Sequence, residues 1–208
     1  MNQIQSHILK IGLMLAVFAI VATSLVSFTE INTREQINEN ERQALLKALN
    51  QLVDVSRYDN DILTDNITLA ASTELGTKQA TQIYRARKGN SPIAAVFTSI
   101  APNGYNGKIK LLVGIYYDGT IAGVRVIKHK ETPGLGDKIV LKKADWILSF
   151  NNLSLQNPVE SKWKVKKDGG NFDQFTGATI TPRAVVSAVK NALLYFKDHR
   201  NELFEVSK

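Results

Sequence analysis

The longest apolar stretch of the chain lies near its N-terminus, where Ile11 to Phe28 form an uncharged run of 18 residues. As an α-helix this run would span about 27 Å, close to the hydrocarbon thickness of a bilayer. Lys10 precedes the run, and Glu30, Arg34, Glu35, Glu39 and Glu41 follow it, which predicts a cytoplasmic N-terminus. The pattern therefore predicts a single-pass anchor with the remaining chain outside the cytoplasm.

A cleaved signal peptide is the alternative for this stretch, because Ala22-Thr23-Ser24 has the small residues of a cleavage site. The apolar run continues past this site to Phe28 and exceeds the usual hydrophobic region of a signal peptide. Its length favours a retained anchor.

Two further segments have helical spacing of their apolar residues. Residues 31–57 carry an apolar stripe opposite polar side chains, and this amphipathic helix is expected to lead from the membrane to a folded domain. From Arg183 onward the apolar residues again recur at helical spacing, and a second helix is expected with Thr181 as its N-cap and Pro182 as its first residue. Residues 58–78 are mixed and predict a short strand or loops, and residues 197–208 form a charged tail.

Between these helical segments the pattern predicts an antiparallel meander of four strands, at residues 82–88, 93–100, 108–117 and 120–129. Asp118-Gly119 joins the last two, and Asp-Gly between β-rich runs is a strong hairpin signal. A helix containing Ile139 to Leu148, capped by Asp137, is expected next, and residues 163–170 predict a short strand and turn. Helices before and after an antiparallel sheet place the fold in the α+β class.

The composition of the chain excludes several kinds of cofactor, catalysis and partner. The 208 residues include no cysteine, which excludes disulfides, cysteine-ligated iron–sulfur clusters and thiol catalysis. His7, His129 and His199 form no metal-spaced pair. The formal charge is +7, but its lysines and arginines are scattered with few aromatic residues among them, so no nucleic-acid partner is expected. An anionic lipid surface or an acidic protein partner accounts for the charge more simply.

Two loops carry candidate chemistry. Asp173 to Thr181 combines threonines with glycine and alanine just before the last helix, and backbone N–H groups at a helix N-terminus bind phosphate. Simple helix capping is the alternative, because such caps are common. The second loop, Glu131 to Gly136, follows the fourth strand, and its proline and two glycines also suit a plain turn leading into a helix.

Both loops resemble motifs of the covalent FMN-binding domain family. Asp173-x-x-Thr176-Gly177-Ala178-Thr179 is similar to the flavinylation motif Asp-x-x-(Ser/Thr)-Gly-Ala-Thr, and Glu131 to Gly136 is similar to the Glu-Thr-Pro-Gly-Leu-Gly segment that precedes it. The resemblance covers roughly residues 80–200 together with the anchor. Within the family it is greatest to the G subunits of Rnf-type (Rsx in some bacteria) electron transport complexes.

The resemblance implies which residues hold the cofactor. FMN would be joined to Thr179 through a phosphoester by a separate flavin transferase, since no base adjoins Thr179 in sequence. The other cofactor-binding residues that the resemblance implies belong to the threonine motif and the isoalloxazine pocket: Asp173, Thr176, Gly177, Ala178, Glu131, Thr132, Pro133, Gly134, Leu135 and Gly136. Two further candidates follow from the residues themselves, Thr181 at the start of the helix and Lys166, which with Lys164 and Lys167 could neutralise a phosphate. A solvated edge-strand face is the alternative for these lysines.

The resemblance also implies a role and a location. The chain would be a redox carrier, not a stand-alone catalyst, in a bacterial inner-membrane complex that couples electron transfer between ferredoxin and NAD to ion movement. Its partners would be the other membrane and redox subunits, with its FMN on the periplasmic side. The expected division is a cytoplasmic start and anchor at 1–30, a connector at 31–78 and the FMN-binding domain at 79–208.

Three alternatives stay open at this point. The first is the flavin-carrying C subunit of the sodium-pumping NADH:quinone reductase, which shares the motif but is typically longer. The second is a cofactor-free, membrane-anchored scaffold, for which Thr179 would be dispensable. The third is a stand-alone flavoenzyme, which the lack of a recognisable acid–base set disfavours.

Overall fold

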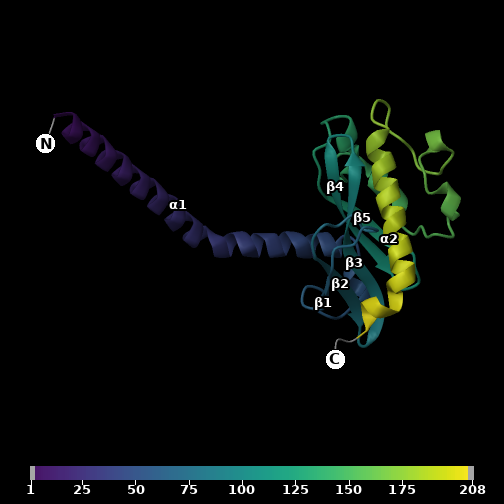
Figure 1. Cartoon of the computed structure of the whole chain (residues 1–208). Helices are drawn as coiled ribbons and strands as arrows, with labels where there is room; N and C mark the ends of the chain where they lie inside the picture. The colour runs from purple at the N-terminus through teal and green to yellow at the C-terminus, as the bar shows by residue number, and fades with distance from the viewer. Residues whose placement is uncertain (1–2, 206–208) are drawn as a thin grey trace. The chain divides into compact units, whose positions relative to one another are not determined.

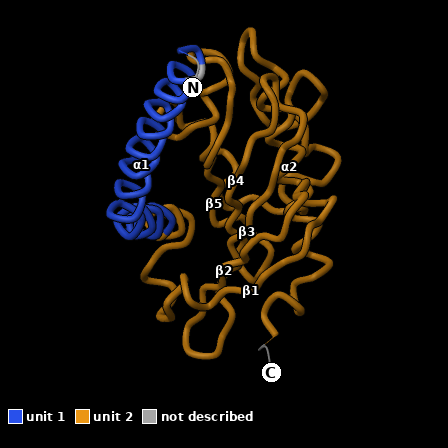
Figure 2. The backbone as a smooth tube through the Cα atoms, turned by 60° about the vertical axis from the view of Figure 1, so that its left-hand side comes forward, with its two compact units in different colours: residues 1–45 blue, residues 46–208 orange. Residues whose placement is uncertain are grey.

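The computed structural model describes residues 3–205 of the chain and contains two compact units, residues 1–45 and 46–208 (Figure 2). The described part of the first unit belongs to helix α1 (Gln3–Asn50). Among the described residues this is the one helix long and apolar enough to cross a membrane by length and composition. Its large apolar side chains between Ile11 and Phe28 are exposed, as expected for an anchor that would face lipid.

The amphipathic segment differs from its prediction at both ends. It continues α1 without a break, and the helix ends at Asn50, not at residue 57. The side chain of Asp54 accepts a hydrogen bond from the backbone N–H of Ser56 and begins a short 3₁₀ helix, η1 (Val55–Arg57). Aspartate in this position offers the backbone an alternative to a continued α-helix, so local side-chain chemistry ends the helix early.

The second unit is built on one antiparallel sheet in the order β1-β2-β3-β4-β5 (Figure 1). Its strands are β1 (Asn66–Leu69), β2 (Thr81–Lys88), β3 (Ser91–Gly104), β4 (Gly107–Tyr116) and β5 (Ile121–Lys128). The four predicted strands are present, and β1 adds an edge strand from the segment left as strand or loops. The predicted α+β class is confirmed.

The β4–β5 hairpin turns at Asp118-Gly119, as predicted. Gly119 has a φ of 91° and donates its N–H to the carbonyl of Tyr116 at 2.8 Å. The side chain of Asp118 accepts the N–H of Thr120 at 2.9 Å. Only Gly119 of the central pair has positive φ, so the loop follows the three-residue form in which glycine takes the left-handed position.

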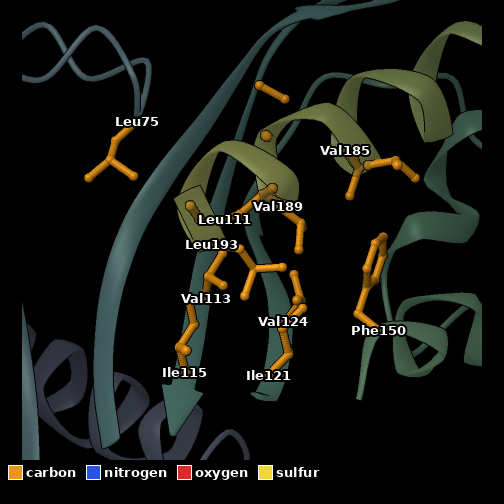
Figure 3. Close-up of a cluster of buried hydrophobic side chains, with 14 of the residues drawn as sticks. Leu75, Leu111, Val113, Ile115, Ile121, Val124, Phe150, Val185, Val189 and Leu193 are labelled. Atoms are coloured by element: carbon orange, nitrogen blue, oxygen red, sulfur yellow. The ribbon is translucent and has the colours of Figure 1, made fainter. Parts of the chain in front are cut away.

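Helix α2 (Ile180–Phe204) covers one face of the sheet (Figure 1). Alternate residues of β4, Leu111, Val113 and Ile115, are fully buried on this face, where Val189 and Leu193 of α2 lie over them (Figure 3). This alternation is what a strand with one face in the core requires. Burying each such side chain stabilises the fold by roughly 1.5–3 kcal/mol.

Residues at the end of α1 and just after it cover the opposite face of the sheet. Leu49, Leu52 and Val53 are buried, and Leu52 lies over Gly114 and Gly123, which pair across β4 and β5. A Cβ at Gly123 would come within 3.1 Å of the Leu52 side chain, so the glycine pair makes room for this leucine. The apolar stripe predicted for residues 31–57 therefore packs on the sheet through its last members.

The connection between β5 and α2 corrects two predictions. The helix expected over 139–148 is absent, and two 3₁₀ helices take its place, η2 (Gly136–Ile139) and η3 (Asp145–Phe150). Asp137 lies inside η2 and does not cap it. The strand expected at 163–170 is reduced to one bridge between Val165 and Phe172, flanked by η4 (Glu160–Lys162) and η5 (Lys166–Asp168).

Aromatic packing explains these departures from local propensity. Phe150 stacks on Phe172 with 4.8 Å between ring centroids, and Trp163 lies 5.1 Å from Phe172. All three rings are buried. These contacts join η3 to the segment that contains η4 and η5, and tertiary packing of this kind overrides local propensity.

The charged tail joins the folded unit as far as the structure describes it. Leu203 and Phe204 are buried at the end of α2. Arg87 donates to the carbonyl of Phe204 at 2.9 Å, and Arg85 to that of Glu205 at 3.0 Å. Asp65 pairs with both arginines, so the end of the helix is held against β2. Residues 206–208 lie outside the described residues.

Candidate functional site

A hollow of about 310 Å³ opens where the β3–β4 turn, the loop after β5 and the start of α2 meet. Its volume lies at the lower end of the range for small-molecule sites. The lining residues are Tyr105, Glu131, Thr132, Leu135, Gly136, Gly177, Ala178, Thr179, Ile180 and Thr181. Both loops singled out in the sequence therefore line one cavity, although they lie far apart in the chain.

The threonine loop is a tight turn held by aromatic residues. Ala178 donates its N–H to the carbonyl of Phe175 at 3.0 Å, and Gly177 has a φ of 78° at the third position of this turn. That position requires positive φ in a type II turn, which only glycine adopts easily. Trp146 packs on Phe175 and donates its ring N–H to the carbonyl of Asp173 at 2.9 Å, so η3 fixes the loop from outside.

Helix α2 begins two residues earlier than predicted. Thr179 occupies the N-cap position and Ile180 is the first helical residue, so Thr181 and Pro182 lie in the first turn. Proline is tolerated there because first-turn N–H groups have no intrahelical acceptor. Thr179 makes no capping hydrogen bond with its side chain, and it lines the hollow. Its hydroxyl is therefore not used to stabilise the helix.

The Thr181 side chain hydrogen-bonds to Glu131 and not to the backbone at the start of the helix. The Thr181 hydroxyl donates to Oε2 of Glu131, and the backbone N–H of Asn106 donates to Oε1 at 3.1 Å. Glu131 is 4% exposed and forms no ion pair with the residues that the structure describes. One buried carboxylate thus ties together the three segments that form the hollow.

Gly136 packs against this carboxylate. A Cβ at Gly136 would lie 2.8 Å from Oγ1 of Thr181 and 2.9 Å from Oε2 of Glu131. These contacts are too short for a side chain, so glycine is required at this position for the Glu131–Thr181 hydrogen bond to form.

Replacing Gly136 with alanine is expected to destabilise the folded unit by about 1–3 kcal/mol, because overpacking at a buried site costs that much. The melting temperature of the full chain would fall by roughly 3–10 °C. Gly134→Asn is the matched control, since a Cβ there meets open space and asparagine tolerates the φ of 77°. Equal melting temperatures for the two variants would contradict this account.

Five predicted site residues do not line the hollow: Pro133, Gly134, Lys166, Asp173 and Thr176. Lys166 and Asp173 instead pair with each other at 2.6 Å on the surface, with 57% and 70% of their side chains exposed. Two lining residues were missed, Tyr105 and Ile180. Ile180 directly follows the threonine motif, and this position could have identified it as a lining residue. Nothing in the sequence around Tyr105 indicated that it would line the hollow.

An arginine–carboxylate pair anchors the first turn of α2. Arg183 donates to both oxygens of Asp168, at 2.6 and 2.8 Å. This hydrogen-bonded pairing holds the pKa of Asp168 below its ordinary value of 3.8. The fork geometry fixes orientation as well as distance, so η5 and the start of α2 are held in one arrangement beside the threonine loop.

The residues that line the hollow lie within a segment that matches a known protein family. Residues 104–194 match the family model of an FMN-binding domain, and this range contains every residue that lines the hollow. Residues 1–52 match the RnfG N-terminal region, which covers the apolar part of α1. The chain is thus a flavoprotein of the FMN-binding domain class, with an N-terminal membrane helix.

Relatives identify the particular family. The chain is 51% identical to the G subunit of the ion-translocating oxidoreductase complex of Pseudoalteromonas atlantica, over 96% of this chain and 93% of the relative. It is 50% identical to the G subunit of Vibrio cholerae, over 93% and 92% of the two chains, and 44% identical to that of Shewanella piezotolerans, over 96% and 94%. It belongs to this family of ion-translocating oxidoreductase G subunits. This confirms the predicted family, and an electron-transfer subunit fits it.

Proposed function

We propose that this chain carries one FMN, joined through a phosphoester to Thr179, as the electron-transfer subunit of a bacterial ion-translocating oxidoreductase. The observation that carries the proposal is the position of Thr179. Its side chain lines the hollow at the N-terminus of α2 and makes no capping hydrogen bond, so its oxygen is available for the bond to phosphorus.

The surroundings of Thr179 suit a phosphate group. The first N–H groups of a helix lack intrahelical acceptors, and the helix dipole adds partial positive charge at the same end. Thr179 stands at this end of α2, a helix of 25 residues. Gly177, Ala178 and Ile180 beside it line the hollow and bring no negative charge, so a phosphate there meets no like charge from them.

Three apolar side chains suit the ring system. Tyr105, Leu135 and Ile180 line the hollow and are 65%, 44% and 44% exposed. Large exposed apolar groups around one opening mark a binding site more often than a plain surface. FMN supplies the electron-transfer chemistry when bound, while these residues orient the ring and exclude water. Glu131, Thr132 and Gly136 would form another part of the wall of the same pocket.

The remaining parts of the proposal concern location and maturation. The charge bias around α1 supports a cytoplasmic N-terminus and a flavin domain on the periplasmic side, at a distance from free cytoplasmic FMN. A covalent bond keeps the cofactor in place there, and a separate flavin transferase would form it. The neighbours would be the other subunits of a complex of the ferredoxin and NAD type. Residues 1–30, 31–78 and 79–208 would serve as anchor, connector and FMN-binding domain.

Intact-mass spectrometry with peptide mapping tests this proposal, on full-length chain produced in a bacterium that contains the transferase. The expected result is a mass increase of FMN less one water, located on the peptide that contains Thr179. An unmodified Thr179, with the transferase shown to act on another protein in the same cells, would contradict it. Modification of Thr176 instead would keep the cofactor and reject the assigned residue.

A further inference from the structure

Four exposed lysines lie on the face of the sheet that is turned away from α2. Lys110 of β4 and Lys128 of β5 are direct cross-strand partners. Successive side chains along a strand point to opposite faces. Ile109 is buried in the core that α2 covers, and Glu131 hydrogen-bonds to α2, so the lysines that flank Ile109 and the one before Glu131 point away from α2. This lysine cluster consists of Lys108, Lys110, Lys128 and Lys130.

The lysine cluster has no acidic partner among residues 3–205, because none of its members forms an ion pair there. Other lysines of the chain do find partners, such as Lys190 with Glu160 at 3.0 Å. Like charges directly opposite each other on two strands destabilise the pairing of the strands. The sheet therefore concentrates positive charge at a cost to its own stability, and an acidic surface outside the folded unit would offset that cost.

The segment that arrives from the membrane anchor packs on this same face of the sheet. Leu52 lies over Gly114 of β4. Gly114 and Lys110 are four positions apart on one strand, so they share a face and lie about 13 Å from each other. The folded unit is thus tethered through the face that carries the lysine cluster, while the hollow lies on the α2 side of the sheet.

We propose that the lysine cluster docks on an acidic, extramembrane surface of a membrane-embedded subunit of the same complex. The relatives are subunits of an ion-translocating oxidoreductase complex, and under the proposed function other subunits of such a complex lie beside the anchor. Docking through the tethered face would leave the hollow, on the other side of the sheet, uncovered for electron exchange. The proposal rests on the part of the proposed function that places the chain in a complex, and not on the attachment of FMN.

An anionic lipid surface fits this position less well than a protein does. The exposed part of α1 between the apolar run and the folded unit, residues 29–44, provides about 24 Å of helix. Attraction between exposed charges decays over about 8 Å at physiological salt. Lipid headgroups at the far end of this helix would therefore contribute little to holding the lysine cluster.

The glutamates of α1 are the alternative within the chain. Their helix carries arginines as well, which offset part of the negative charge. The charged residues between positions 29 and 44 are Glu30, Arg34, Glu35, Glu39, Glu41 and Arg42. An acidic surface without interspersed arginines would match the lysine cluster better, and the experiments below separate the two partners.

Zero-length cross-linking with a carbodiimide tests the contact directly. The reagent joins a lysine amine to a carboxylate with loss of one water, so it captures groups that are already in contact. In the complete complex, purified in a neutral detergent, peptides that contain the lysine cluster should be joined to acidic peptides of another subunit. Links from the cluster only to the glutamates of α1 would overturn the proposal.

A variant in which all four lysines of the cluster are glutamine measures what the contact contributes. The complex is captured through a tag on another subunit and washed in neutral detergent at about 20 and 300 mM KCl, which give weak and strong screening. The variant should be retained about tenfold less than wild type at the lower salt, because complementary charge raises association rates by about 10–10³-fold. Wild-type retention should fall toward that of the variant at the higher salt.

The matched control removes the same formal charge from another part of the folded unit. It replaces four exposed lysines that lie outside the cluster and form no ion pair within the described chain: Lys88, Lys138, Lys142 and Lys197. This control should be retained like wild type at both salt concentrations. A control that is lost as readily as the cluster variant would show that net charge alone holds the chain, and would overturn the docking surface.

Two further outcomes would overturn the docking proposal. One is a cluster variant that is retained like wild type at both salt concentrations. The other is a difference between variant and wild type that appears in nanodiscs containing phosphatidylglycerol and disappears in phosphatidylcholine, which would assign the cluster to lipid. Fluorescence of attached FMN on a denaturing gel keeps this test separate from the flavin proposal. A wild-type chain that cross-links to another subunit through its lysines but carries no FMN would reject the attachment and keep the docking surface.

Discussion

Replacing Thr179 with alanine is expected to abolish attached flavin and to reduce electron flow through the complex by at least about 10²-fold, the gain that tethering typically provides. The alanine chain has no hydroxyl to bond to phosphorus. Its fold should be unchanged, because the Thr179 side chain makes no capping hydrogen bond and is only half-buried. The measurements are denaturing-gel fluorescence, electron-transfer rate and melting temperature of the same preparations.

Two matched variants sharpen this prediction. Thr179→Ser keeps a hydroxyl at the N-cap position, so its melting temperature should match wild type whether or not the transferase accepts serine. Thr176→Ala removes the exposed hydroxyl of the turn, so flavin that remains attached to this variant would show that residue 176 is not the attachment site. Undiminished electron flow through a complex containing Thr179→Ala would reject the redox role and restore the scaffold alternative.

The parts of the fold that the sequence predicted are those fixed by local periodicity. Alternation along β4 places Leu111, Val113 and Ile115 on one face, and Asp118-Gly119 sets the hairpin. The spacing of Val185, Val189 and Leu193 likewise defines the buried face of α2. In each case neighbours in sequence decide the element, so no knowledge of the rest of the molecule is needed.

The parts that the sequence did not predict depend on contacts between distant segments. Phe150 and Phe172 lie 22 positions apart in the chain, yet their rings stack where 3₁₀ helices and one bridge stand in place of the predicted helix and strand. Thr181 had the chemistry and position of an N-cap, but its hydroxyl bonds to Glu131, 50 residues away. Tyr105 lies in a turn with no motif of its own, and only the assembled fold brings it to the hollow.

The two motif loops form a candidate site only in combination. Neither a small-residue turn nor a proline–glycine loop forms a site alone, and each has an ordinary structural explanation. The structure joins them through Glu131, whose carboxylate receives hydrogen bonds from the start of α2 and from the β3–β4 turn. The two separated motifs are therefore joined by a physical link that the sequence did not reveal.

Replacing Glu131 with leucine should separate these segments. The N–H of Asn106 and the hydroxyl of Thr181 would both lose their acceptor at a buried position, and each unpaired donor costs about 1–3 kcal/mol. Unfolding free energy should fall by about 2–4 kcal/mol, which for a unit of this size lowers the melting temperature by roughly 5–15 °C. Thermal unfolding of the full chain, followed by circular dichroism, measures the change.

Glu131→Gln separates the hydrogen-bonding role of this residue from its charge. Glutamine can still accept from Asn106 through its carbonyl oxygen and can donate to the Thr181 oxygen, so most of the stability lost with leucine should return. If the carboxylate serves to hold the three segments, the glutamine chain will also recover attached FMN when produced with the transferase. A glutamine variant as unstable as the leucine variant would show that the negative charge, not the hydrogen-bond geometry, holds the start of α2 in place.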